Sequence, residues 1–327
     1  MEFRLDDGQV DLQRTVARFC EDRFPLDTIA AREGLPVDRA RWTEMAQLGI
    51  FGLRVPEAHG GSGLGAIEGA IVFEQLGAHL VPGPVLWTLL GAPHLDDVVG
   101  GGVVVGGITA AAVRDGSAIV EHAADLDILL LVGDDGIRAL RTASLAPPTP
   151  LQPLDPLTPV GRFTDLPPGD LVADAAAAAA LRALGTVLSA AMLTGIASQA
   201  LEVARAYALE REQFGSAIGS FQAIKHLLAD MYVRSTLAQS ATYAAAAVLQ
   251  APGDDDPARA TAGAKLLAGE AAITNASNAV QILGGMGFTW DMLPNHLLKR
   301  AWVLEQGFGT ADDHALHLGT SLVAASR

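Results

Sequence analysis

The stretch that decides the fold is Arg211-Glu-Gln-Phe214-Gly215, which joins two long segments predicted to be helical at about 171–210 and 220–249. A second glycine-rich stretch, Gln281-Ile-Leu-Gly284-Gly285-Met-Gly287, follows a third predicted helix at about 258–283. An arginine supplies positive charge, and glycines let backbone N–H groups approach a ligand closely. The two stretches together therefore predict a clamp for a pyrophosphate.

Three regions that differ in hydrophobic pattern and composition follow one another along the chain. Residues 1–92 have helical periodicity around a glycine-rich loop, which we interpret as a surface turn because no lysine-serine or lysine-threonine pair follows it. Residues 93–168 contain short aliphatic runs separated by Gly and Asp-Gly turns, which predict a small β-domain. Residues 169–327 are helical again. The predicted fold class is mainly α with a small β-domain.

Composition excludes several classes of function. The net charge is −15, which argues against nucleic acid and against anionic membrane surfaces as partners. The charge-free run at 184–201 is interpreted as a buried helix, because its apolar bulk lies on one stripe. A single cysteine, Cys20, and an N-terminus without an apolar signal region lead us to expect a cytoplasmic protein.

Both glycine-containing motifs resemble those of the C-terminal domain of the acyl-CoA dehydrogenases, which are FAD-dependent flavoproteins. The order of parts at 48–77 also resembles the N-terminal helical domain of that family, so that the resemblance covers nearly the whole chain. It implies an N-terminal helical domain at 1–92, a reduced middle β-domain at 93–168 and a C-terminal four-helix-type bundle at 169–327. The resemblance further implies cofactor binding by Arg211, Phe214, Gln281, Gly284 and Gly285.

The carboxylate that serves as catalytic base in this family has no counterpart at either of its usual positions. One position, just before Gly309-Thr310, is occupied by Phe308. The other, in the long helix that leads to Arg211, falls near Gly185. Glu305 and Asp312 are the alternative acids nearest to the first position, and either acid offers a relocated base. The middle region also lacks the Thr-Glu and Trp-Ile-Thr motifs that line the flavin ring in ordinary members.

These losses lead to the hypothesis that the chain is a non-catalytic subunit of a heteromeric dehydrogenase, resembling the α2β2 enzymes of actinobacterial steroid side-chain oxidation. It would complete the FAD site of a second subunit that carries the catalytic Glu and would share an acyl-CoA substrate with it. Electron-transfer flavoprotein is the expected electron acceptor. The alternatives are a self-sufficient homo-oligomeric dehydrogenase that uses a relocated acid, and a scaffold subunit without flavin.

The same residues also allow purely structural interpretations, without a ligand. Arg211 has acidic neighbours in Glu210 and Asp230 and is open to an ordinary salt bridge, and the 281–287 stretch is also typical of a helix C-cap. His314 and His317 lie beside Asp313 at helical spacing, but without a third well-spaced ligand no metal site is predicted.

Overall fold

The structure is a computed structural model that describes residues 5–290 and 292–325. By internal packing the chain forms two compact units whose segments interleave in sequence. The bundle unit comprises the described parts of 1–31, 66–81 and 186–327, and the sheet unit comprises 32–65 and 82–185. The predicted domain borders at 92 and 168 do not coincide with the borders of these units.

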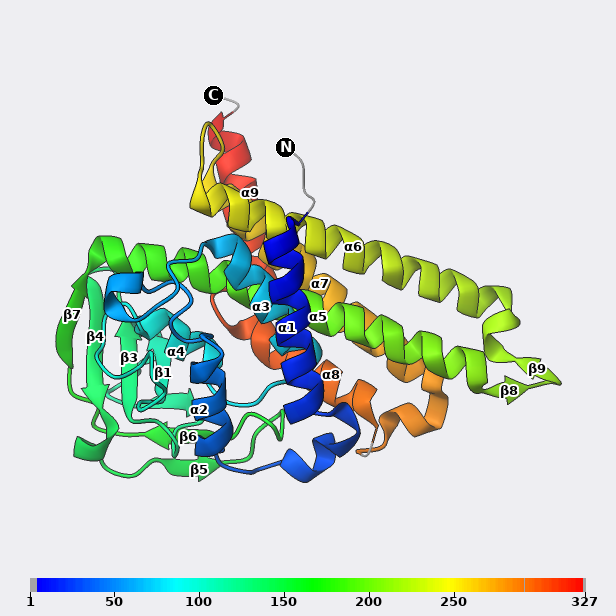
Figure 1. Cartoon of the computed structure of the whole chain (residues 1–327), viewed down its shortest axis with the longest axis horizontal. Helices are drawn as coiled ribbons and strands as arrows, with labels where there is room; N and C mark the ends of the chain where they lie inside the picture. The colour runs from blue at the N-terminus through cyan, green and yellow to red at the C-terminus, as the bar shows by residue number, and fades with distance from the viewer. Residues whose placement is uncertain (1–4, 291, 326–327) are drawn as a thin grey trace. The chain divides into compact units, whose positions relative to one another are not determined.

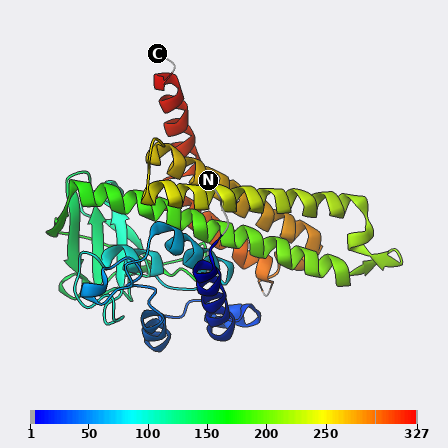
Figure 2. The same ribbon diagram turned by 45° about the horizontal axis from the view of Figure 1, so that its top comes forward.

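The bundle unit consists of helices and one small hairpin (Figure 1). Its elements are α1 (Asp7–Arg23), α3 (Ala66–Ala78), most of α5 (Ala175–Glu210), β8 (Glu212–Gln213), β9 (Ser216–Ala217), α6 (Gln222–Gln250), α7 (Pro257–Leu283), α8 (Leu293–Gln306) and α9 (Ala311–Ala325). Figures 1 and 2 show α5, α6 and α7 running side by side. The helices predicted at 220–249, 258–283, 292–306 and 310–325 are confirmed to within two residues at each end.

Small residues let these helices approach each other closely. A Cβ atom built on Gly77 of α3 would lie 2.1 Å from the carbonyl oxygen of Met192 in α5. A Cβ atom built on Gly195 would lie 2.0 Å from the carbonyl oxygen of Glu74. Both distances are far below van der Waals contact, so the backbones of α3 and α5 touch at this crossing.

Buried polar side chains bind helices of the bundle unit to one another. The Asn275 amide of α7 donates to the carbonyls of Ala197 in α5 and Met231 in α6 at 3.2 and 2.9 Å. Glu74 of α3 accepts hydrogen bonds from the Gln239 amide and the Tyr243 hydroxyl of α6 at 2.7 and 2.6 Å. Because unsatisfied polar groups are costly in a core, these contacts favour one register of the helices.

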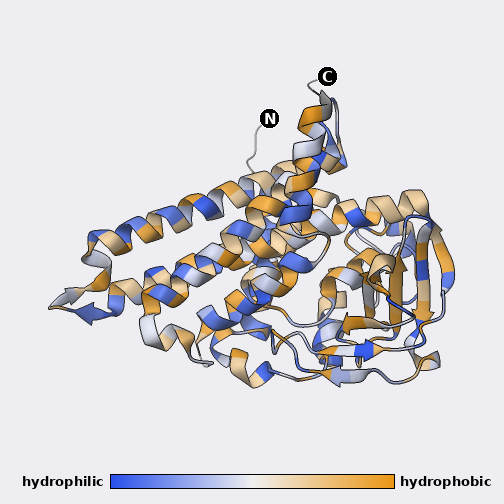
Figure 3. Cartoon of the chain, turned by 180° about the vertical axis from the view of Figure 1, so that it is seen from behind, coloured by the Kyte–Doolittle hydropathy of each residue, from blue (hydrophilic) through white to orange (hydrophobic). Residues whose placement is uncertain are grey.

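The sheet unit holds the β-strands of the middle region. Its elements are α2 (Arg39–Gln47), α4 (Val85–Gly91), β1 (Val105–Thr109), β2 (Ala118–Glu121), β3 (Ile128–Val132), β4 (Gly136–Arg141), β5 (Thr149–Leu151), β6 (Val160–Phe163), β7 (Asp170–Asp174) and the first turns of α5. One sheet has the order β1-β3-β4-β7, with β1 parallel to β3, and a second has the antiparallel order β2-β6-β5. All five residues of β3 are buried, and Figure 3 shows the central strands of the first sheet as hydrophobic.

The start of the long helix differs from the prediction. Residues 170–174 form β7, which pairs with β4, whereas the sequence pattern predicted helix from about Leu171. The helix begins at Ala175, where the Asp174 carboxylate accepts from the amide of Ala177 at 2.9 Å. The alanine run 175–180 therefore sets the start of the helix, and the Leu171-Val172 pair before it extends the sheet.

Within residues 5–290 and 292–325, one helix, α5, is long and apolar enough to cross a membrane by length and composition. Within its most apolar window 67% of the residues are buried inside the chain, as they are in the core helix of a globular fold.

Candidate functional site

The Arg211 stretch forms a β-hairpin between α5 and α6. Strands β8 and β9 pair Gln213 with Ser216, which leaves Phe214 and Gly215 as a two-residue loop with φ values of +55° and +78°. Positive φ at both positions is the pattern of a type I′ turn. A left-handed conformation costs a residue with a side chain about 1–2 kcal/mol, so Phe214 is strained where Gly215 is not.

The side chains of this hairpin point away from the core of the chain. Phe214 is 95% exposed, and its ring has an edge contact with Phe221 at 6.2 Å between centroids. Arg211 is exposed and, within the described part of the chain, forms no ion pair with Glu210 or Asp230. A strained and exposed aromatic ring beside an uncompensated cation is typical of a surface that contacts another molecule.

The second glycine-rich stretch ends α7. Gly284 has φ +65° and ψ −142°, a conformation that favours glycine, and begins the short 3-10 helix η6 (Gly284–Phe288). A Cβ atom built on Gly284 or Gly285 would meet no atom within 4 Å, whereas one on Gly287 would lie 2.5 Å from the Val280 carbonyl. Gly287 is therefore needed for packing, and the first two glycines leave open backbone beside the exposed Gln281.

Both stretches lie at one end of the bundle unit. Because α5, α6 and α7 alternate in direction, the end of α5, the start of α6 and the end of α7 meet at this end (Figures 1 and 2). Exposed apolar side chains accompany them, with Met286 50%, Phe288 73% and Trp290 58% exposed.

Neither of the two usual base positions holds an acid in the structure. Phe308 lies in the connection between α8 and α9, half-buried and with φ +59°, and Gly185 is buried within α5. Glu305 has its carboxylate bonded to the amides of Ala311 and Gln306, each at 2.6 Å, so it caps the start of α9. Asp312 is exposed in the first turn of α9, where an acid stabilises the helix dipole.

The position of His314 is explained by a hydrogen bond within the chain and does not require a metal ion. Its Nε2 donates to the carbonyl of Phe308 at 3.1 Å, and burial lowers its pKa. The described residues contain no group of three His, Cys, Asp or Glu side chains placed to hold a metal ion.

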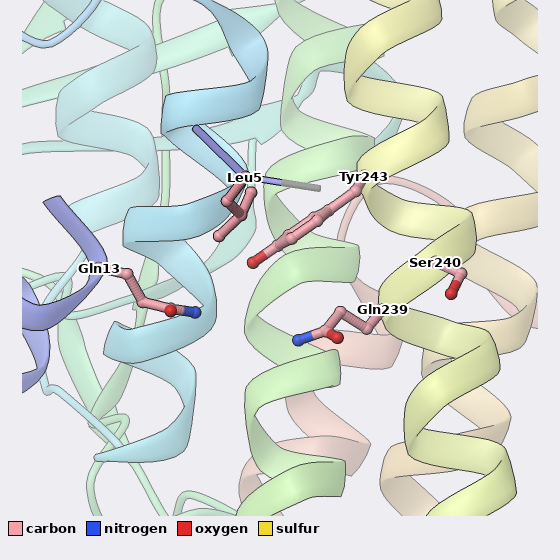
Figure 4. A pocket seen from close by; sticks show the side chains of 5 residues that line it. All are labelled: Leu5, Gln13, Gln239, Ser240 and Tyr243. Atoms are coloured by element: carbon pink, nitrogen blue, oxygen red, sulfur yellow. The ribbon is translucent and has the colours of Figure 1, made fainter. Parts of the chain in front are cut away.

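A separate polar cavity of about 270 Å³ lies between α1 and the second half of α6, lined by Leu5, Gln13, Gln239, Ser240 and Tyr243 (Figure 4). Gln239 is 17 residues from the start of α6 at Gln222, which places the cavity about 26 Å along the helix from the hairpin. The cavity therefore does not belong to the candidate site.

Comparison with known sequences identifies the family. The acyl-CoA dehydrogenase C-terminal domain matches residues 177–322, and the acyl-CoA dehydrogenase N-terminal domain matches residues 6–95. The acyl-CoA dehydrogenase IpdE2 of Mycolicibacterium smegmatis is 31% identical over 304 residues, which cover 89% of this chain and 91% of that protein. The chain belongs to the acyl-CoA dehydrogenase family.

Two further proteins are similar. Acyl-CoA dehydrogenase FadE34 of Mycobacterium tuberculosis is 33% identical over 79% of this chain, but the match spans only 38% of FadE34. A chain of the ChsE4-ChsE5 complex from Mycobacterium tuberculosis superposes with a TM-score of 0.85 at 24% identity and covers 99% of both chains. This likeness establishes the fold, which confirms the prediction of a mainly helical protein with a small β-domain.

FAD is the cofactor of this family, and the residues of this chain fit the distal part of it. Among the described residues, Arg211 has no carboxylate partner that would compete for a pyrophosphate. The backbone at Gly284 and Gly285 borders open space, into which the side chain of any other residue at these positions would project. The assignment of Arg211, Phe214, Gln281, Gly284 and Gly285 to cofactor binding stays a prediction. Sequence reasoning did not single out Lys265, whose ammonium donates to the carbonyls of Glu305 and Gly309, because a lone lysine in a predicted helix carries no local signal.

Proposed function

We propose that this chain is the non-catalytic subunit of a heteromeric FAD-dependent acyl-CoA dehydrogenase and completes the flavin site of a catalytic partner. The observation that carries the proposal is an asymmetry. Residues suited to a flavin pyrophosphate lie at one end of the bundle unit, where Arg211 and Gly285 are exposed and Gly284 is half-buried, while the base positions hold Phe308 and Gly185.

In the proposed complex the exposed end of this chain lies against the partner. Arg211 binds the pyrophosphate, the open backbone at Gly284 and Gly285 donates to it, and Phe214 packs on the partner's surface. The chemistry that FAD supplies when bound is acceptance of a hydride from the β-carbon of the acyl thioester. Removal of the α-proton falls to a Glu of the partner, because this chain offers no acid at either position.

The proposed substrate is an acyl-CoA thioester with a bulky acyl group, such as a steroid side-chain CoA. Two observations support a heteromeric assembly: the vacant base positions, and the likeness to a chain of the ChsE4-ChsE5 complex, which is itself a complex of two proteins. We further propose electron-transfer flavoprotein as the acceptor and the cytoplasm as the location.

The alternatives receive less support. A relocated base at Glu305 conflicts with the two hydrogen bonds that its carboxylate accepts from Ala311 and Gln306. A scaffold without flavin leaves the uncompensated charge of Arg211 and the strain of Phe214 without a reason.

The test is co-production of this chain with a catalytic acyl-CoA dehydrogenase that carries the Glu base, sought first among the genes next to that of this chain. The complex should be yellow and active on acyl-CoA, while the chain alone should retain little FAD. Arg211→Ala should lower flavin occupancy of the complex by about tenfold or more, since a charge-assisted contact is lost. Arg205→Ala is the matched control, because Arg205 lies in the last turns of α5, just before Arg211, and is paired with Glu202. Stoichiometric flavin and turnover by the chain alone would refute the proposal, and full occupancy in Arg211→Ala would favour the scaffold.

A further inference from the structure

The polar cavity between α1 and α6 has the size and the lining of a small-molecule site. Its volume is about 270 Å³, slightly below the range of about 300–1,000 Å³ that is typical of pockets for drug-sized ligands, so it suits a smaller molecule. Figure 4 shows the polar ends of Gln13, from α1, and of Gln239 and Tyr243, from α6, directed toward the same space. Among the described residues that line the cavity, Leu5 alone is apolar.

The polar lining keeps hydrogen-bonding capacity that the described chain does not use. The side chains of Gln13 and Ser240 make no hydrogen bond with described residues, and each can donate or accept. Tyr243 donates its hydroxyl proton to Glu74 at 2.6 Å, so its oxygen is left as an acceptor only. Gln239 donates to the same carboxylate at 2.7 Å and keeps its amide oxygen as an acceptor. A ligand with several N–H donors would satisfy these groups.

The charge behind this lining is negative and has no counter-charge. Glu74 is 6% exposed, and within the described part of the chain no cation pairs with it. Burial raises its pKa, because the carboxylate has lost water without gaining a positive neighbour. An N–H donor bonded to Tyr243 Oη would lie within about 5.4 Å of this carboxylate, the sum of the 2.6 Å contact and an ordinary hydrogen bond of about 2.8 Å. A cationic donor would therefore bind better than a neutral donor.

We infer that the cavity is a binding site for a small alkylammonium ligand. The ammonium group donates to Tyr243 Oη and to the amide oxygen of Gln13, and the alkyl chain packs against Leu5. The site lies about 26 Å along α6 from the hairpin, so it goes beyond the proposed function and requires neither flavin nor a partner subunit. Because its lining comes from α1 and α6, the bound ligand links these two helices and stabilises the folded chain.

Calorimetric titration of the full chain with butylammonium tests the charge of the ligand. The buffer is phosphate, which contains no competing amine, and 1-butanol is the matched neutral probe. Butylammonium should bind with one-to-one stoichiometry and at least about tenfold more tightly than 1-butanol, because only the cation offsets the charge of Glu74. Absence of saturable butylammonium binding, or an equal affinity for 1-butanol, would overturn the inference.

Glu74→Gln tests the source of the attraction at nearly constant side-chain size. The variant removes a buried charge without a counter-charge, so it should fold. Its affinity for butylammonium should fall by about tenfold or more, while its affinity for 1-butanol stays within about twofold. An unchanged affinity for butylammonium would show that Glu74 does not attract the ligand and would overturn the inference.

A second variant covers the case in which Glu74→Gln does not fold. Gln13→Leu removes a polar group that bonds to no described residue, and it should weaken butylammonium binding by about fivefold or more. Gln222→Leu is the control, because Gln222 is an exposed glutamine at the start of α6, outside the cavity. The Tm of the control, but not that of Gln13→Leu, should rise over the same range of butylammonium concentration. Equal affinities and equal Tm shifts in the two variants would overturn the inference.

Discussion

Replacing Phe214 by asparagine should separate the stability of the chain from its ability to form a flavin site. Phe214 occupies a left-handed position that asparagine tolerates better, so the change should relieve about 1 kcal/mol of strain. The ring is 95% exposed, so little burial is lost. Its edge contact with Phe221 is worth about 0.5–1.5 kcal/mol. Because these effects oppose each other, the free energy of unfolding should change by less than about 1 kcal/mol.

Assembly should respond quite differently to the same substitution. An aromatic anchor at an interface contributes about 2 kcal/mol or more to binding, so the partner's affinity should fall roughly 30-fold. The assays are urea unfolding of the free chain, followed by titration of the catalytic subunit with flavin absorbance as the readout. Leu35→Asn is a matched control, because Leu35 is 56% exposed and lies in the sheet unit.

Two results would refute this reasoning. A loss of more than about 2 kcal/mol in the unfolding free energy would mean that Phe214 stabilises the chain itself. An affinity for the partner within twofold of the unmodified chain would mean that the exposed ring is not part of the assembly surface.

Three further predictions concern other parts of the bundle unit. Gly195→Ala should destabilise the chain by about 3 kcal/mol in urea unfolding, because the added Cβ would meet the backbone of α3. Gly263→Ala is the control and should stabilise the chain by up to about 1 kcal/mol, because its Cβ would point into open space. Equal effects of the two substitutions would contradict the close crossing of α3 and α5. Glu305→Gln and Asp312→Asn should each leave kcat of the complex within about threefold, and a loss of a hundredfold or more would identify a relocated base. Burial raises the pKa of Glu74 above 4.5, so the folded chain binds its proton more tightly than the unfolded chain. The stability of the unmodified chain relative to Glu74→Gln should therefore fall as the pH rises from about 4.5, and a rising difference across pH 4–8 would exclude this explanation.

The sequence was most informative where a local rule governs the structure. Helix periodicity located α6, α7 and α8, and the spacing from Arg211 to Gly284 identified the family. The start of α5 was misplaced, because a strand pairs with β4 through contacts that are distant in sequence.

The features that sequence reasoning did not find depend on tertiary structure. No local signal predicts that Lys265 binds carbonyls 40 and 44 residues away. Nor does any local pattern show that α3 belongs with the bundle unit, because the contact of Gly77 with Met192 joins segments separated by residues 82–185 of the sheet unit. The three consecutive regions were visible as changes in composition, but composition does not report which regions pack together.

The bundle unit is built from three separate segments of the chain, which affects the order of events during synthesis. Helix α3 leaves the ribosome more than a hundred residues before the part of α5 on which it packs. Until Met192 and Gly195 have been translated, the glycine face of α3 has no surface to meet. A nascent chain arrested before residue 186 therefore cannot complete this unit, and the face of α3 that packs on α5 stays uncovered until α5 has been made.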